Sequence, residues 1–90
     1  MKMTKKMYAQ ADEIKVMIET MCDEESLTEQ EYIERVIYHF RDNISTPNKR
    51  LTVYNYLHHP KMDRGNNNWY WLLRRIRNTG QIQRIIKKFE

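Results

Sequence analysis

The sequence predicts an all-α fold, in the form of a single small domain with four or five short helices. The 90 residues are enough for one domain and too few for two. Glycine and proline occur only twice each, which disfavours a β-sheet with many tight turns. Apolar residues recur three and four positions apart in several segments, which is the period of an amphipathic helix.

The first helix is predicted at residues 3–22, where an apolar stripe follows the helical period. Its members are Met3, Met7, Ile14, Met17, Ile18 and Met21. Because methionine fills irregular gaps in a core, we interpret the stripe as core, with an adaptable partner surface as the alternative. Three members are spaced by seven residues, so a homodimer joined through this helix is a further hypothesis.

The second helix has a clear start signal. Thr28 is a good N-cap, Glu31 follows at the position of a capping box, and Leu27 can pack against Tyr32. The core stripe of this helix comprises Ile33, Val36, Ile37 and Phe40, with Ile44 close to the end.

The third helix opens at Ser45-Thr46-Pro47, which is a capping hydroxyl followed by a proline at the first helical position. Its predicted buried line is Leu51, Tyr54 and Leu57, which Val53 can join. Pro60 ends this helix, because proline cannot continue the hydrogen-bond ladder. A loop that contains Gly65 then leads to the next helix.

The last two helices lie on either side of Gly80. The fourth occupies residues 67–79, is capped by one of the asparagines at its start, and ends at Gly80 as a C′ residue. After it, Ile82, Ile85, Ile86 and Phe89 repeat the helical spacing, so a short fifth helix is predicted and a β-strand is the alternative.

The fourth helix has two different faces. The core face carries Trp69, Leu72, Leu73 and Ile76, whereas the opposite face carries Trp71, Arg74, Arg75 and Asn78. Tyr70 lies at the margin. A wet indole on a polar face forgoes about 2–3 kcal/mol of hydrophobic stabilisation, so we expect something to cover Trp71. The candidates are a stacked arginine, the first helix, or a ligand.

The charge is divided unevenly between the two halves of the domain. Residues 1–45, with the first two helices, carry six Lys and Arg against ten Asp and Glu, a net charge of −4. Residues 46–90, with the other three helices, carry ten against two, a net charge of +8. A basic half favours an acidic partner, of which nucleic acid is the commonest, although mutual attraction of the two halves is the simpler reading.

A cationic strip is therefore predicted along the fourth and fifth helices. The candidate nucleic-acid-binding residues are Asn67, Asn68, Trp71, Arg74, Arg75, Asn78, Arg84, Lys87 and Lys88. Lys49, Arg50, Lys61 and Arg64 precede them and extend the strip. Arginine and lysine would neutralise phosphates or contact guanine edges, and Asn66, Asn67 and Asn68 at a helix start add donors for an anion.

The run NNWYWLLRRIRNTGQIQRI, residues 67–85, resembles the recognition helix of winged-helix and other helix-turn-helix DNA-binding proteins. In that family a polar start and an apolar line precede a basic stretch and a glycine. The resemblance implies a helix-turn-helix-like C-terminal half and duplex DNA as the partner, with Asn67, Asn68, Trp71, Arg74 and Arg75 at the major groove. The chain departs from winged-helix proteins in its long loop and its helical tail, where they have a wing.

Nothing in the sequence predicts an enzyme, a cofactor or a metal site. His58-His59 lacks neighbouring ligands at zinc spacing, and two glycines are too few for a phosphate-binding loop. With one cysteine, no apolar signal segment and no long apolar run, an intracellular location without a membrane span is expected. The alternative function is a small phage-type inhibitor or adaptor that blocks a host factor, such as a nucleic-acid-binding enzyme.

Overall fold

Five α-helices follow one another along the chain in the computed structural model, which describes residues 2–24, 26–63, 65 and 67–87. They are α1 (Lys5–Glu24), α2 (Glu29–Asn43), α3 (Pro47–Leu57), α4 (Asn68–Asn78) and α5 (Ile82–Ile86), with a 3-10 turn at Pro60–Met62 between α3 and α4. The all-helical prediction is confirmed, and a helix rather than a strand follows Gly80.

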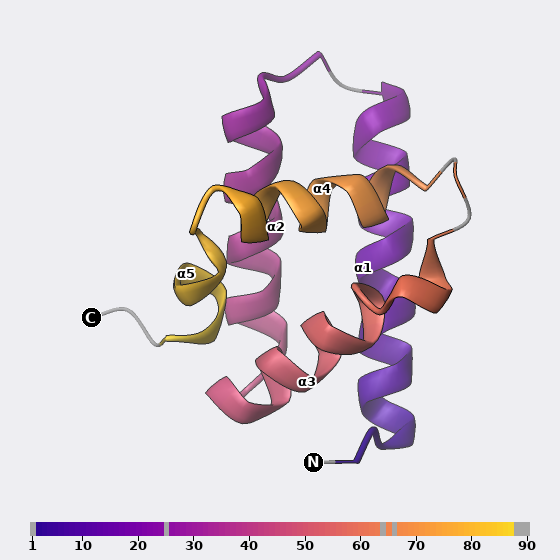
Figure 1. Ribbon diagram of the computed structural model, residues 1–90, viewed down its shortest axis with the longest axis vertical. Helices are drawn as coiled ribbons and strands as arrows, with labels where there is room; N and C mark the ends of the chain where they lie inside the picture. The colour runs from indigo at the N-terminus through magenta and orange to yellow at the C-terminus, as the bar shows by residue number, and fades with distance from the viewer. Residues whose placement is uncertain (1, 25, 64, 66, 88–90) are drawn as a thin grey trace.

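The helices form two layers (Figure 1). α1 and α2 make an antiparallel pair, and α3 and α4 cross in front of it, running in opposite directions. α5 closes one side of the fold, where it contacts α2 and α3. The Cα radius of gyration is 12.2 Å, the value expected for one compact domain of this length.

Local signals set the helix ends where the sequence predicts them. The Thr28 hydroxyl accepts a hydrogen bond from the Glu31 N–H at 3.2 Å, and the Glu31 carboxylate accepts one from the Thr28 N–H at 3.0 Å. The hydrogen bond from the Thr28 N–H to the Glu31 carboxylate, and next the Thr28 side chain, hold the pKa of Glu31 below its usual value. The Thr46 hydroxyl caps α3 by accepting the Lys49 N–H at 3.2 Å, ahead of Pro47.

The end of α4 is a Schellman motif. The N–H of Gln81 donates to the Ile76 carbonyl at 2.9 Å, and the N–H of Gly80 donates to the Arg77 carbonyl at 3.1 Å. Gly80 has a φ of 73°, in the left-handed region where a side chain would be strained. The motif turns the chain sharply, so that α5 begins two residues later.

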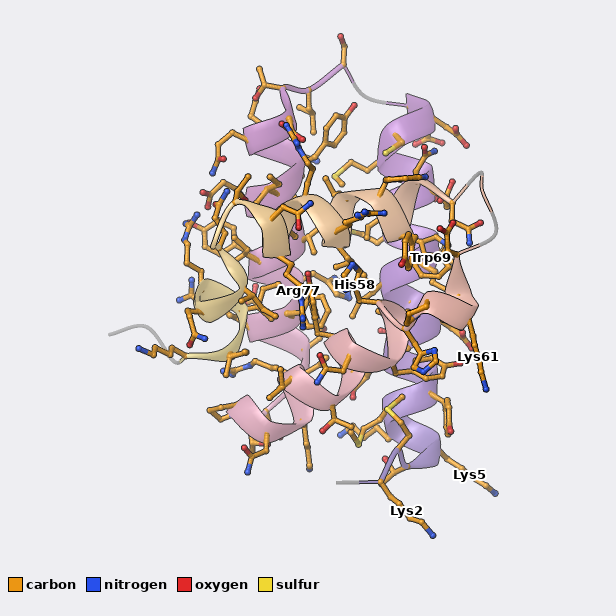
Figure 2. All side chains as sticks on the ribbon, in the orientation of Figure 1. Lys2, Lys5, His58, Lys61, Trp69 and Arg77 are labelled. Carbon is orange, nitrogen blue, oxygen red and sulfur yellow. The ribbon has the colours of Figure 1, made fainter. Side chains whose placement is uncertain are left out.

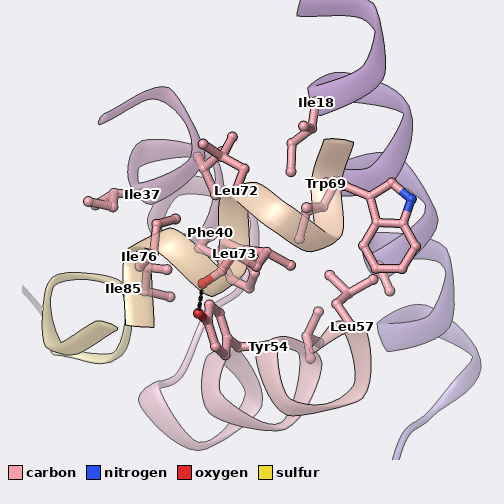
Figure 3. Close-up of a cluster of buried hydrophobic side chains, with 14 of the residues drawn as sticks. Ile18, Ile37, Phe40, Tyr54, Leu57, Trp69, Leu72, Leu73, Ile76 and Ile85 are labelled. Carbon is pink, nitrogen blue, oxygen red and sulfur yellow. Dashed lines mark hydrogen bonds between the residues drawn. The ribbon is translucent and has the colours of Figure 1, made fainter. Parts of the chain in front are cut away.

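All five helices contribute to a single hydrophobic core (Figure 3). The predicted core face of α4 is buried, and so are four members of the α1 stripe: Met7, Ile14, Ile18 and Met21. Met3 and Met17 are only partly buried at its edge. Tyr70, which was expected at the margin of α4, is buried, because its ring stacks on that of His58.

The two front helices are joined by polar as well as apolar contacts. His58 and Arg77 lie between α3 and α4 (Figure 2). The Tyr54 hydroxyl of α3 donates a hydrogen bond to the Leu73 carbonyl of α4 (Figure 3). Burial raises the pKa of Tyr54 to about 12, so this hydroxyl remains a donor well above neutral pH.

α3 differs from the prediction at one residue that matters for the surface. Arg50 was expected in the cationic strip, but it is only 5% exposed, whereas Leu51 is partly exposed. The Arg50 guanidinium donates hydrogen bonds to three carbonyls, those of Ile44 at 2.8 Å, Ile86 at 3.2 Å and Arg41 at 3.4 Å. These carbonyls lie at the C-terminal ends of α2 and α5, where the helix dipoles favour a cation. Arg50 is therefore an internal cap shared by two helices.

Candidate nucleic-acid interface

The two tryptophans of α4 point to opposite sides, as the helical period predicts. Trp69 is 7% exposed and lies under Lys15 of α1, whose Nζ is 5.3 Å from the ring centroid. Trp71 is 48% exposed. The Arg74 guanidinium, one turn further along, lies 5.2 Å from the centre of the Trp71 ring. This distance is within the range of a cation–π contact, so Arg74 covers part of the indole.

Arg74 is the arginine of the strip that keeps its charge accessible. It is exposed, and within the described part of the chain it forms no ion pair. Asn78 is exposed on the same side of α4, and Lys87 is exposed just beyond α5. Lys88, Arg64 and Asn66 lie outside the described residues.

Arg75 and Arg84 are engaged by carboxylates of α2. Arg75 Nε lies 2.7 Å from Glu29 Oε1, and both side chains are more than half exposed, at 57% and 52%. Arg84 binds Glu34 through two parallel bonds, of 2.6 and 2.7 Å, with side-chain exposures of 36% and 29%. The Arg84 bonds hold the pKa of Glu34 below its usual value. The acidic half thus neutralises part of the basic half.

The asparagines at the start of α4 bind other parts of the same chain. Asn67 occupies the N-cap position but makes no side-chain cap, because its Nδ2 donates to the Met62 carbonyl at 2.9 Å. An asparagine therefore stands at the predicted N-cap position, but its side chain does not form the capping hydrogen bond. Glu19 of α1 takes its place: its carboxylate accepts hydrogen bonds from the Trp69 N–H and from Asn68 Nδ2, both at 3.2 Å. The N-terminus of α4 already has an internal anion beside it.

Arg77 and His58 form a polar contact region that the sequence analysis did not single out. The Arg77 guanidinium lies 5.7 Å from the Tyr54 ring centre and donates to Asn55 at 3.2 Å. His58 stacks on Tyr70, with ring centroids 5.2 Å apart, and its Nε2 is buried without a hydrogen-bond partner in the described chain. Burial, and then the nearby Arg77 and Arg74, lower the pKa of His58. The i, i+4 spacing of Tyr54 and His58 in the sequence was the signal that could have predicted that these two rings meet on one face of the helix.

The rest of the described chain has no feature of a metal centre. No group of three or more His, Cys, Asp or Glu side chains among residues 2–24, 26–63, 65 and 67–87 is placed to hold a metal ion. Partial burial, together with Glu19 and Asp23, raises the pKa of the Cys22 thiol, which disfavours the reactive thiolate. In the same residues, no helix combines the length and apolar character that crossing a membrane requires.

Comparison with protein-family models, with curated proteins and with solved structures gives no match for this chain.

Proposed function

We propose that this protein binds nucleic acid through the exposed face of α4, with duplex DNA as the expected partner. The observation that carries the proposal is the half-exposed Trp71 with Arg74 stacked on its ring. Tryptophan and arginine are among the side chains enriched at the hot spots of protein interfaces, and aromatic and guanidinium planes are also the surfaces on which bases stack. Stacked together, they offer a flat apolar surface for a sugar or base beside a charge for a phosphate.

The three arginines of the strip rank differently as phosphate ligands. Arg74 needs no carboxylate to be displaced, so we expect it to contribute most. Arg75 follows, because its pair with Glu29 is solvent-exposed and such pairs exchange partners at little cost. Arg84 comes last, because two parallel bonds hold it to Glu34 in a less exposed site. Lys87 and Asn78 would extend the contact at the end of the strip.

The helix-turn-helix resemblance assigns α4 the place of the recognition helix, with α3 as its partner. Residues 58–67 connect the two helices, which is longer than the usual turn of three or four residues. We therefore rest the proposal on the Trp71 face and its charge, and the resemblance only suggests that a major groove is its target.

The test is a gel-shift or anisotropy titration of random-sequence duplex DNA over a series of salt concentrations. Each phosphate contact steepens the negative slope of log affinity against log salt by about 0.9, so the loss of one contact in Arg74→Ala should flatten the slope by roughly that amount. Trp71→Ala should weaken binding about 5- to 30-fold at every salt concentration, since it removes contact area rather than charge.

Tyr38→Ala is the matched control. Tyr38 is also about half exposed and pairs with an arginine one turn away, at 5.6 Å from Arg41, but it lies on α2. The Tyr38→Ala variant should bind DNA with the affinity of the unaltered protein. Affinity that does not change between low and moderate salt would refute nucleic-acid binding, and equal losses for Tyr38→Ala and Trp71→Ala would remove the role of α4.

A protein partner is the second candidate, in the sense of a small inhibitor or adaptor. The ion pairs of Arg75 and Arg84 with α2 favour it, because they reduce the charge that the strip presents and leave Trp71 as its main feature. A pull-down with and without nuclease separates the two: a stoichiometric protein partner that survives nuclease, and is lost with Trp71→Ala, would favour this candidate over the first.

A further inference from the structure

A second concave surface lies away from Trp71, beside the 3-10 turn. It is a hollow of about 240 Å³ lined by Tyr56, His59, Lys61 and Met62, which we call the Tyr56 hollow. Tyr8 of α1, 46% exposed, meets Tyr56 of α3 edge to face, with ring centroids 5.2 Å apart. The two tyrosines therefore present aromatic surface from two helices that pack against each other.

Cations surround this aromatic surface. Lys15 Nζ lies 5.8 Å from the Tyr56 ring centre, and Lys61 is exposed at the rim. Lys2, Lys5 and Lys61 project from the same edge of the molecule (Figure 2). His59, which also lines the hollow, accepts the Lys61 N–H at its Nδ1, at 3.1 Å, within the 3-10 turn.

The described carboxylates Asp12, Glu19 and Asp63 lie near these cations, and each is already engaged; Glu19 accepts the Trp69 N–H and Asn68 Nδ2, both at 3.2 Å. Asp12 is 3.6 Å from Lys15 Nζ, and Asp63 accepts the Gly65 N–H at 3.0 Å within its own loop. The lysines at this edge outnumber the carboxylates, so the edge keeps a net positive charge. They are Lys2, Lys5, Lys15 and Lys61. An anionic ligand is therefore favoured over a neutral apolar one.

We propose that the Tyr56 hollow binds an unpaired base of a single-stranded nucleic acid. The base would stack on Tyr56, and Tyr8, whose ring stands at 87° to that of Tyr56, would meet the edge of the base. The neighbouring phosphates would follow Lys61 and Lys5. Stacking on aromatic side chains needs a base whose faces are free, which a duplex does not offer and a single strand does. The hollow is smaller than the roughly 300–1,000 Å³ of sites for drug-sized ligands, which suits one planar ring.

The experiment is an anisotropy titration of a labelled single-stranded thymidine oligonucleotide of about eight nucleotides at low salt. Tyr56→Leu keeps an apolar side chain and removes the ring, and Tyr8→Leu does the same at a more exposed position. Each should weaken binding about 5- to 100-fold. Thermal denaturation of both variants tests whether they fold. If Tyr56→Leu does not fold, the binding of Tyr8→Leu alone decides the result.

Matched variants separate this site from general attraction and from the α4 face. Lys61→Glu should weaken binding strongly. Lys6→Glu makes the same charge change at a residue that lines a different hollow, with Met7 and Asn43, and should weaken it little. Tyr38→Leu makes the same change at a half-exposed tyrosine of α2 and should leave single-strand binding intact. The duplex proposal is scored on duplex DNA and this one on the single strand, so failure of one is not confused with failure of the other.

Four results would overturn the inference. The first is no binding of the oligonucleotide at low salt, and the second is equal weakening by Lys61→Glu and Lys6→Glu. The third is displacement by poly-glutamate as effective as displacement by unlabelled oligonucleotide, which would make the ligand an acidic chain of any kind. The fourth is competition by thymidine monophosphate at the same concentration as unlabelled oligonucleotide, which would mean that the ligand is a free nucleotide and not a single strand.

Discussion

Replacement of Arg50 by methionine should destabilise the protein strongly, although no carboxylate among the described residues pairs with this arginine. Methionine keeps an apolar stem of similar length and removes the guanidinium. Three carbonyls then lose a donor: those of Ile44, Ile86 and Arg41. They lie in the interior ends of α2 and α5, where water replaces the lost donor poorly because Arg50 is only 5% exposed.

The size of the effect follows from the hydrogen-bond lengths. A bond to a charged group contributes about 1.5–3 kcal/mol, and the bonds of 2.8 and 3.2 Å are well formed, whereas the 3.4 Å bond is weak. Release of a buried charge offsets part of this loss. We expect a net loss of about 3 kcal/mol from a total of roughly 5–13 kcal/mol, or a fall in Tm of about 10–25 °C.

Urea denaturation, followed by circular dichroism, measures this loss. Arg50→Lys should lose less, since it keeps the charge and at least one donor. Arg74→Met is the control, because it removes an exposed arginine from α4 and should change the free energy of unfolding little. The Arg50→Met loss should be the same at low and high salt, because its partners are carbonyl dipoles. A loss below about 1 kcal/mol would refute the reasoning.

Three further predictions concern contacts around α4. Burial lowers the pKa of His58, so the folded protein favours the neutral imidazole. The free energy of unfolding should therefore fall as the pH is lowered through 6.5, the ordinary pKa of histidine in the unfolded chain. Urea titrations of His58→Gln should lack this fall. Tyr54→Phe should cost about 0.5–1.5 kcal/mol in urea, and should abolish the tyrosine ionisation step near pH 12 in a spectrophotometric titration. Glu19→Gln should lower the free energy of unfolding by about 0.5–1 kcal/mol, because it removes the anion beside the start of α4; no change in urea titration would contradict this.

The features that the sequence predicts correctly depend on residues within one or two helical turns of each other. The Thr28 capping box, the start at Pro47 and the left-handed Gly80 are all set by near neighbours. The opposite orientations of Trp69 and Trp71 follow from the helical period alone. For these features, local sequence and final structure agree because no distant contact overrides them.

The residues that the sequence assigns wrongly or leaves out are those whose partners come from other helices. Arg50 was expected at the surface because it is an arginine in a basic segment, but it is buried, since the ends of α2 and α5 converge on it. Asn67 bonds to the 3-10 turn instead of capping its own helix. The engagement of Arg75 and Arg84 by α2 was foreseen only as an attraction between the two halves, since the pairing requires knowledge of how α4 and α5 lie on α2.

The unequal surroundings of the two indoles give the protein a pair of optical reporters that need no label. Emission from Trp69, enclosed beside Lys15, should respond chiefly to loss of the packed interior, whereas emission from Trp71 should respond to whatever touches the outside of α4. Iodide, drawn toward the guanidinium of Arg74, should quench Trp71 first, and a molecule seated there should shield it. Unfolding and surface occupancy can thus be followed separately in one unmodified sample.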